Sequence, residues 1–291
     1  MIEVIQEHGR KRLTEGSLFM DVQDFGNCRQ RYSGSVILLA SGPSTAEFPL
    51  KRYAGVPVLA MNGSILRCTD EGIVPFFYLC DDPGFVRNRP MLARQGASQA
   101  LNLAMSLHCF QALHGFAPDV LSGKSLYLLE RANRMQGQAV LSDRAYAWSV
   151  RKDPDLLCGF SLLHNKPNRI GFSFNMGKGY FGARTIPYAS LQLALHLGFS
   201  QVFIVGMDLN TSLGRFYEAG EKAIPSTLDE DYDDYILPSF ALTREKAFLE
   251  RGVRVFNLSA NSRLPHSVVP KISMDEMDSL LGMSAVAGRE C

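Results

Sequence analysis

Several features that mark specialised proteins are absent from this 291-residue sequence. The six cysteines, at positions 28, 68, 80, 109, 158 and 291, form no CxxC pair and no zinc-ligand spacing, which predicts a reducing, cytoplasmic setting. No run approaches the roughly 18 apolar residues that a membrane span needs. The N-terminus also lacks the apolar core and cleavage site of a secretory signal. With 46% hydrophobic and 20% charged residues, a soluble globular protein is expected.

The net charge of +1 hides an uneven distribution. Residues 86–184 contain 13 Lys and Arg but only 5 Asp and Glu, so the remainder of the chain is acidic. A basic segment is typical of proteins that bind an anionic partner. A solvated surface with uneven charge has the same composition, so the charge alone leaves both readings open.

Short apolar runs predict buried strands, since they are apolar throughout rather than alternating. The runs are Val36–Ala40, Val56–Met61, Val74–Cys80, Gln201–Val205 and Val253–Leu258. Ile186–Leu197, which stops at Gly198, and Thr243–Arg251 have helical character. Strands alternating with helices predict an α/β fold with a Rossmann-like, mostly parallel sheet flanked by helices.

The stretch 86–168 has a different composition, with few β-branched residues and many Leu, Ala, Met, Gln and Arg. Within it, 97–116 and 125–135 predict helices, so we expect a helical insertion in the sheet domain. The acidic run 228–235 predicts a mobile loop within a lid. The expected organisation is an α/β domain of 34–85 and 169–270, a helical insertion of 86–168, a lid of 209–240, and peripheral segments 1–33 and 271–291.

Small, polar or acidic residues follow all five predicted strands. In open α/β sheets, ligands bind beyond the carboxyl ends of the strands, so these residues predict a ligand site, although any one of them could be a plain turn. They are Ser41–Ser44, Asn62–Ser64, Asp81–Asp82, Gly206–Asp208 and Ser259–Ser262.

The stretch "SVILLASGPSTAEF" (35–48) predicts a strand, a tight turn and a helix start. Such a turn can donate backbone N–H groups to a phosphate, and Asn62 can pair with a nucleobase or ribose. The fingerprint GxGxxG, a Walker GK[ST] and a GxSxG elbow are all missing.

The stretches "LLASGPST", "LAMNGSILRC", "FFYLCDD", "GFSFNMGKGYFGARTIPYASLQLALHLGFSQVFIVGMDLNTSLGRFYE" and "YILPSF" resemble the WaaZ/RfaZ family of lipopolysaccharide core proteins. The similarity covers residues 35–270 and is best over 171–238. More distantly, the pattern resembles bacterial sialyltransferases that use CMP-sialic acid. The resemblance implies a glycosyltransferase that moves Kdo from CMP-Kdo to a Kdo-lipid A core acceptor with inversion, using no metal or cofactor.

The resemblance also implies roles for individual residues. It assigns donor binding to Ser41, Gly42, Pro43, Ser44, Asn62, Gly63, Gly206 and Asp208. Tyr217, beside Phe216, falls near a tyrosine that the sialyltransferases set against the leaving phosphate. Their lid histidine is missing here, since residues 235–239 read "YILPS".

The catalytic base must therefore be another residue. Carboxylate candidates are Asp82, Asp208, Glu218 and Asp234. Asp82 is preferred because it follows a buried strand, whereas Asp208 could equally hold the loop or the ribose.

Arginine and tyrosine side chains are expected to bind the negatively charged groups of the substrates. Arg215 and Tyr217 are candidates for stabilising the leaving phosphate, or belong to a surface loop in which Tyr217 packs against the core. Arg184 is a candidate for pairing with the sugar carboxylate. Arg87, Arg89 and Arg94 are candidates for contacting acceptor phosphates.

The triplet Asp229–Asp231 is spelled like a metal-binding DxD but lies in an acidic, loop-like run, so no metal is expected. The expected partners are a nucleotide-sugar donor and an anionic lipopolysaccharide acceptor, with no nucleic acid and peripheral contact with the inner membrane. Two alternatives remain: a pyrophosphokinase using ATP and a metal on a similar sheet, and a non-catalytic assembly protein that has lost its base.

Overall fold

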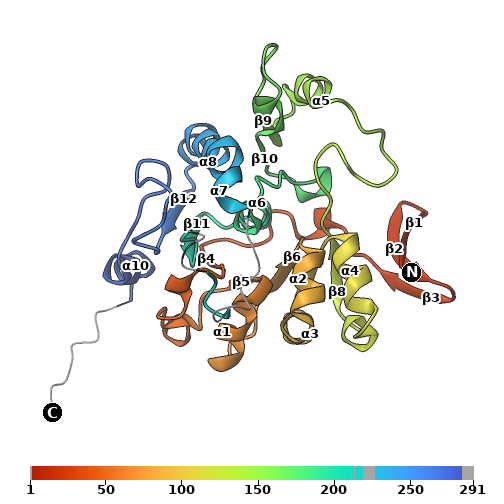
Figure 1. Cartoon of the computed structure of the whole chain (residues 1–291), viewed down its shortest axis with the longest axis horizontal. Helices are drawn as coiled ribbons and strands as arrows, with labels where there is room; N and C mark the ends of the chain where they lie inside the picture. The colour runs from red at the N-terminus through yellow and green to blue at the C-terminus, as the bar shows by residue number, and fades with distance from the viewer. Residues whose placement is uncertain (1, 211, 213, 219–226, 284–291) are drawn as a thin grey trace.

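The computed structural model describes residues 2–210, 212, 214–218 and 227–283. Its centre is a seven-stranded sheet in the order β12-β11-β4-β5-β6-β7-β8, with every neighbouring pair parallel (Figure 1). The strands are β4 (Ser35–Leu39), β5 (Val58–Met61), β6 (Phe77–Cys80), β7 (Asn102–Met105), β8 (Ser125–Leu128), β11 (Gln201–Val205) and β12 (Arg254–Asn257). The α/β fold with a parallel sheet is confirmed, and each of the five apolar runs forms a strand.

The direction of the chain through the sheet changes beside β4. From β4 the chain moves outward through β5 to β8, and then returns to the other side of β4 to form β11 and β12. Leu39 aligns with Val205 of β11 and with Ala60 of β5, so the residues following these strands emerge at one level. Such a switch point is where open α/β sheets bind ligands.

Helices cover both faces of the sheet and divide the core in two (Figure 1). On one face lies α6 (Ile186–Leu197), whose predicted bounds are confirmed and which is buried on nearly all sides. The other face is covered by α1 (Ile65–Asp70), α2 (Pro83–Asn88), α3 (Pro90–Gln99), α4 (Leu107–His114) and α10 (Met274–Leu281). No helix in the described ranges has the length and hydropathy needed to span a membrane.

The prediction of a helical insertion over 86–168 is wrong in its first half. Both segments predicted as helices, 97–116 and 125–135, contain strands of the central sheet, β7 and β8. These strands read NLAM and SLYL, so they carry Leu, Ala and Met in place of β-branched residues. A central strand buried on both faces needs only to be apolar, and here its position in the sheet overrides its helical propensity.

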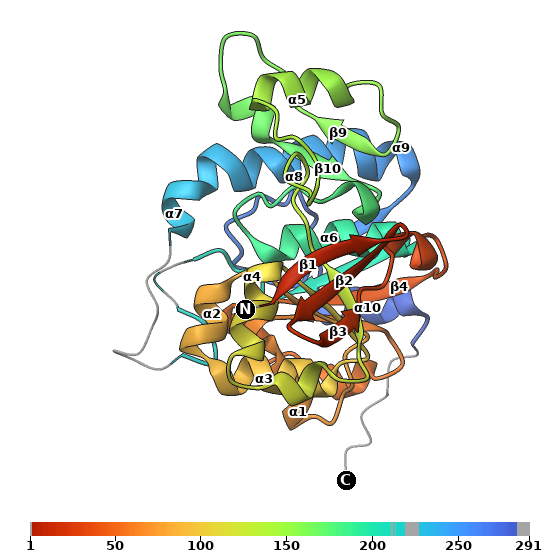
Figure 2. The ribbon, with the colours of Figure 1, turned by 90° about the vertical axis from the view of Figure 1, so that its right-hand side faces the viewer.

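A smaller layer follows β8. It comprises α5 (Asp143–Val150) and the antiparallel pair β9 (Leu156–Cys158) and β10 (Gly171–Ser173). Both views place α5 and β9 above α6, on the side away from the sheet (Figures 1 and 2).

The acidic run 228–235 is helical, which corrects the expected loop. It forms α7 (Leu228–Asp231) and a π-helical turn (Tyr232–Ile236), and continues through α8 (Leu237–Thr243) and a second π-turn (Arg244–Phe248) into α9 (Leu249–Arg251). Tyr232, Ile236 and Phe240 are buried at a spacing of four, which gives this helix an apolar face. Carboxylates in its first turn also complement the helix dipole.

The N-terminal segment is less peripheral than expected. Its strands β1 (Glu3–Glu7), β2 (Arg10–Glu15) and β3 (Leu18–Asp21) form an antiparallel sheet, and Val22 bridges to Leu126 of the edge strand β8. Phe25 and Cys28 are buried in the core beside α6. Short 3₁₀ turns complete the fold at Phe25–Cys28, Pro43–Thr45, Leu50–Tyr53, Asn62–Ser64, Pro118–Leu121, Lys166–Arg169 and Met176–Lys178. The expected peripheral segment 271–291 contains α10, and its residues 284–291 lie outside the described ranges.

Candidate active site

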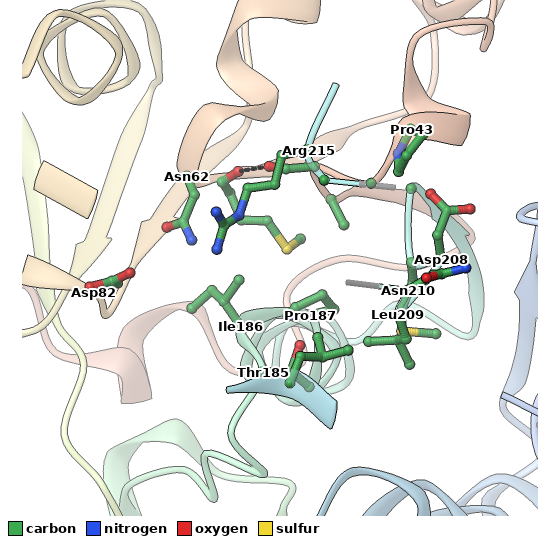
Figure 3. Close-up of a pocket in the computed structure, with 18 of the residues that line it drawn as sticks. Pro43, Asn62, Asp82, Thr185, Ile186, Pro187, Asp208, Leu209, Asn210 and Arg215 are labelled. Atoms are coloured by element: carbon green, nitrogen blue, oxygen red, sulfur yellow. Dashed lines mark hydrogen bonds between the residues drawn. The ribbon is translucent and has the colours of Figure 1, made fainter. Parts of the chain in front are cut away.

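A cavity of about 460 Å³ opens at the carboxyl ends of β4, β5, β6 and β11, within the size range typical of ligand pockets. Asp82 and Asp208 lie at opposite ends of it, and the Arg215 guanidinium points toward Asn62 (Figure 3). Ten predicted site residues line it: Ser41, Gly42, Pro43, Asn62, Asp82, Arg184, Gly206, Asp208, Arg215 and Glu218. The other predicted site residues do not: Ser44, Gly63, Tyr217, Arg87, Arg89, Arg94 and Asp234.

Hydrogen bonds within the protein close the Ser41–Ser44 turn. The Gly42 amide donates to the carbonyl oxygen of Gly206 (2.8 Å), and the Ser44 amide donates to Asp208 Oδ2 (3.0 Å). Pro43 has no N–H. The Gly42 and Ser44 amides therefore already have acceptors within the protein, and phosphate binding by this turn stays a prediction.

Asp208 holds this turn in place. It is 4% exposed, and its Oδ2 accepts hydrogen bonds from both the amide and the hydroxyl of Ser44. A Cβ at Gly42 would lie 2.2 Å from that oxygen and 2.5 Å from the carbonyl oxygen of Gly206, so only glycine fits there. Of the two roles left open for Asp208, the geometry favours loop-holding over acting as a base.

Asn62 has an unsatisfied polar atom at the cavity. It follows β5 with a left-handed φ of 48°, a conformation that Asn tolerates better than most residues. Its Oδ1 is buried and has no hydrogen-bond partner in the part of the chain that the structure describes. Buried polar atoms are almost always paired, so this oxygen marks a place for a ligand donor.

Gly63 and Tyr217 form a packing contact behind the cavity. A Cβ at Gly63 would lie 2.0 Å from a ring carbon of Tyr217, so glycine is needed for the ring to pack there. Tyr217 also makes edge contacts with Phe85 and Phe216, and burial raises its pKa above the ordinary tyrosine value. Tyr217 thus packs against the core, which was the alternative to a phosphate-binding role.

Arg215 belongs to a cationic group at the cavity wall. Its Nη1 lies 2.9 and 3.1 Å from the two carboxylate oxygens of Glu218, and Arg89 Nη2 lies 3.6 Å from Glu218 Oε1. The amide of Phe216 donates to the carbonyl oxygen of Ser41, which fixes this segment to the turn after β4. Two guanidinium groups therefore face one buried carboxylate at the cavity wall.

The remaining arginines of α2 and α3 lie away from the cavity. Arg87 is exposed on α2, and Arg94 pairs with Asp119 at 2.9 Å. Arg89 is not among the cavity residues, but its Nη2 lies 3.6 Å from the cavity residue Glu218.

Asp82 is the exposed carboxylate at the cavity. It caps α2 by accepting a hydrogen bond from the Gly84 amide (2.8 Å) through Oδ1. Asp234, another candidate base, is not among the cavity residues and pairs with Lys166. Asp82 therefore remains the candidate base.

Arg184 sits at the start of α6 in a strained backbone. Both Ala183 (φ 41°) and Arg184 (φ 59°) adopt left-handed conformations, which cost energy in non-glycine residues and concentrate at functional sites. Its Nε lies 3.7 Å from Asp231 Oδ1, and Thr185 and Ile186 bring the positive end of the α6 dipole to the cavity.

The triplet Asp229–Asp231 does not gather into a metal site. Asp229 pairs with Arg263 (2.6 Å), whereas Asp231 faces Arg184. Among the described residues, no group of three His, Cys, Asp or Glu side chains is placed to hold one ion.

Sequence reasoning missed several cavity residues: Thr185, Ile186, Pro187, Leu209, Asn210, Thr227 and Leu228. The "RTIP" helix start after a glycine-rich loop was the available signal for the first three.

The chain is similar to several known proteins. Residues 20–275 match the family described as 3-deoxy-D-manno-octulosonic acid transferase WaaZ. A probable 3-deoxy-manno-octulosonic acid transferase of Escherichia coli K12 is 24% identical over 262 residues, covering 90% of each chain. One of Salmonella typhimurium LT2 is 24% identical over 250 residues, covering 86% of this chain and 90% of the relative.

Two solved structures are also similar. The MAf glycosyltransferase of Magnetospirillum magneticum AMB-1 has a TM-score of 0.46 at 14% identity, covering 88% of this chain and 38% of that one. The sialyltransferase CstII of Campylobacter jejuni, in complex with CMP-3FNeuAc, has a TM-score of 0.40 at 11% identity, covering 81% and 85%.

Proposed function

Because the chain belongs to the 3-deoxy-D-manno-octulosonic acid transferase WaaZ family, we propose that it transfers Kdo from CMP-Kdo to a Kdo-lipid A core acceptor with inversion. The observation that carries this proposal is the cavity at the switch point, with the unpaired Asn62 oxygen on its wall. A cavity of this size at this edge suits a nucleotide ester.

The cavity offers a separate contact for each part of the donor. Asn62 accepts a hydrogen bond from the base or ribose, and Arg215, with Arg89 behind it, balances the phosphate charge. The donor carboxylate is placed at the start of α6, where Arg184 and the helix dipole both favour an anion. Ser41, Gly42, Pro43 and Gly206 shape the wall rather than bind charge.

The reaction is a displacement at the anomeric carbon of Kdo. The acceptor hydroxyl oxygen bonds to that carbon as the bond to the phosphate oxygen breaks, and CMP leaves with the electron pair. Asp82 takes the hydroxyl proton, and Arg215 stabilises the charge growing on the phosphate. No metal or cofactor is needed, since guanidinium groups can balance this charge.

The acceptor's lipid requires the enzyme to work at a membrane. We propose that the protein acts at the cytoplasmic face of the inner membrane as a peripheral protein.

A thermal-shift panel of CMP, CTP, UDP, GDP and ATP with magnesium tests the donor class. Selective stabilisation by CMP and CTP, lost in the variant Asn62→Gly, is the expected result. Stabilisation by ATP with magnesium alone would favour a pyrophosphokinase. Binding of CMP without any Kdo transfer, measured by mass spectrometry of the acceptor, would favour a non-catalytic assembly protein.

A further inference from the structure

A second cavity of about 240 Å³ adjoins the first and holds charged groups that the donor does not use. The two cavities share Arg184, Thr185, Ile186 and Thr227, so they are contiguous. The second is smaller than the roughly 300–1,000 Å³ typical of pockets for drug-sized ligands, which suits a single sugar unit.

Its wall is built around Asp81, the residue before the candidate base. Arg131 Nη2 donates to Asp81 Oδ2 at 2.8 Å, and the hydroxyl of Tyr180 donates to the same oxygen. Within the part of the chain that the structure describes, the hydrogen bonds of Asp81 use Oδ2 alone, which leaves Oδ1 for a ligand. The Asp81 side chain is 18% exposed, and Arg131 is 51% exposed.

The backbone fixes this group firmly. Arg131 and Tyr180 form a parallel bridge, in which the Tyr180 amide donates to Glu130 and the Ala132 amide donates to Tyr180. Tyr180 is 1% exposed, and burial, with the nearby Asp81 charge, raises its pKa well above the ordinary value. The phenol therefore stays protonated and keeps donating to Asp81.

We propose that the second cavity binds the acceptor as an acidic sugar unit, with Asp81 Oδ1 accepting a hydrogen bond from a sugar hydroxyl. Arg131 faces its carboxylate. This inference rests on the proposed function, since it places an acceptor beside the donor cavity. The neighbouring aspartates then divide the work: Asp81 binds the acceptor and Asp82 takes its proton. Tyr180 acts through Asp81 as a positioning residue.

The matched variants Asp81→Asn and Asp82→Asn test this division. Asparagine at 81 can still accept from Arg131 and Tyr180, so the fold is kept, but Nδ2 replaces the accepting oxygen. The acceptor KM should rise about tenfold or more in Asp81→Asn with kcat little changed, whereas Asp82→Asn should lower kcat with KM little changed. Tyr180→Phe should raise the acceptor KM less than Asp81→Asn does. Arg131→Met should also raise this KM, and Arg131→Lys should raise it less because lysine keeps the positive charge.

Calorimetry with the methyl glycoside of Kdo, in the absence of nucleotide, supplies a readout independent of transfer. Asp81→Asn should weaken this binding about tenfold while CMP affinity stays within about twofold. Unchanged binding of the glycoside, or an equal loss of CMP affinity, would overturn the inference. Failure of the wild-type protein to bind CMP would instead count against the proposed function.

A different observation supports a second inference. The small layer above α6 exposes apolar side chains near its tip: Trp148 on α5 (53% exposed) and Phe160 (41%), Leu162 (69%) and Leu163 (85%) after β9. The Trp148 and Phe160 rings are 5.4 Å apart, which brings the two segments together. We call these four residues the apolar tip.

Basic residues border the apolar tip. Arg151 lies over the Trp148 ring at 3.7 Å, Lys152 is exposed beside it, and Arg144 contacts Asn165 in the loop that follows Leu163. Apolar side chains bordered by cations match the interface of an anionic bilayer, in which apolar groups enter the acyl boundary and cations meet lipid phosphates.

We infer that the apolar tip inserts into an anionic membrane surface. Trp148 is the only tryptophan in the chain, so its fluorescence reports this event directly. Vesicles of phosphatidylcholine with phosphatidylglycerol should shift its emission to shorter wavelength, and vesicles of phosphatidylcholine alone should shift it less.

Two variants sharpen this test. The double change Arg151→Gln and Lys152→Gln should weaken vesicle affinity about 30-fold, and Leu163→Asp about tenfold. Met91→Asp, at an apolar residue that is 73% exposed on α3, should leave it unchanged. No emission shift with the anionic vesicles, or an equal effect of Met91→Asp, would overturn the inference.

Discussion

The two ends of the cavity between Asp82 and Asp208 are built differently. At the β4–β11 end, the polar groups of Gly42, Ser44 and Asp208 bond to one another. At the β5–β6 end, the Asn62 oxygen is unpaired and Asp82 is exposed. Groups that are already paired hold the shape of the site, and unpaired groups are left for a ligand. The residue types in a strand-end motif therefore do not reveal whether its polar groups hold the shape of the site or bind a ligand.

At the β4–β11 end, adding a side chain at Gly42 should lower the free energy of unfolding most. Gly42→Ala places a Cβ against Asp208 and a backbone carbonyl, so the free energy of unfolding should fall by about 3 kcal/mol. Urea denaturation measures this. The matched control is Gly55→Ala, because a Cβ there meets nothing within 4 Å. Equal stabilities of the two variants would mean that the β4–β11 end is not tightly packed around Gly42.

Removing the carboxylate of Asp208 should lower the free energy of unfolding by the next largest amount. Asp208→Ala leaves the Ser44 amide without its acceptor in a buried place, so the free energy of unfolding should fall by about 2 kcal/mol. Asp208→Asn keeps an acceptor and should retain most of the stability and transfer activity. If Asp208→Asn folds normally but loses activity about a hundredfold, the carboxylate is catalytic and the two ends are not distinct.

At the β5–β6 end, losing the Asn62 side chain should weaken binding rather than folding. Asn62→Gly keeps the left-handed backbone and removes the unpaired oxygen, so stability should hold while CMP affinity falls about tenfold. Titration calorimetry and urea denaturation on the same samples separate the two quantities. A loss of stability with unchanged CMP affinity would mean that Asn62 belongs with the structural residues.

The same contrast explains how far the sequence could be interpreted. Helix α6 could be predicted to the residue, because an apolar stretch ends at a glycine that adopts φ 109°. Strands β7 and β8 could not, since only their place in the sheet selects strand over helix. The strand-end residues were found, but whether their polar groups are paired depends on contacts between distant segments. Asp81, Arg131 and Tyr180 meet across separations of 50 and 99 residues, which no local pattern reveals.

The two ends of α6 also differ, since one faces the cavity and the other is buried. This difference gives the smallest predicted effect, a pH dependence of stability. The first turn of α6 faces the cavity, whereas near its last turn His196 is buried between the Met176 amide, which donates to Nδ1, and the Phe25 carbonyl, which accepts from Nε2. Burial lowers the pKa of His196, so the unfolded chain takes up this proton first as pH falls. Its contribution to stability is therefore present above the unfolded pKa of about 6.5 and is lost as pH falls below it, by at most about 1.4 kcal/mol per pH unit.

Urea denaturation between about pH 7.5 and about pH 5.5 should show this slope in the wild-type protein. The slope should shrink in His196→Gln, because glutamine does not titrate. The exposed control His164→Gln should keep it. An unchanged slope in His196→Gln would assign the pH dependence to other groups, and the buried end of α6 would then no longer contrast with the end that faces the cavity.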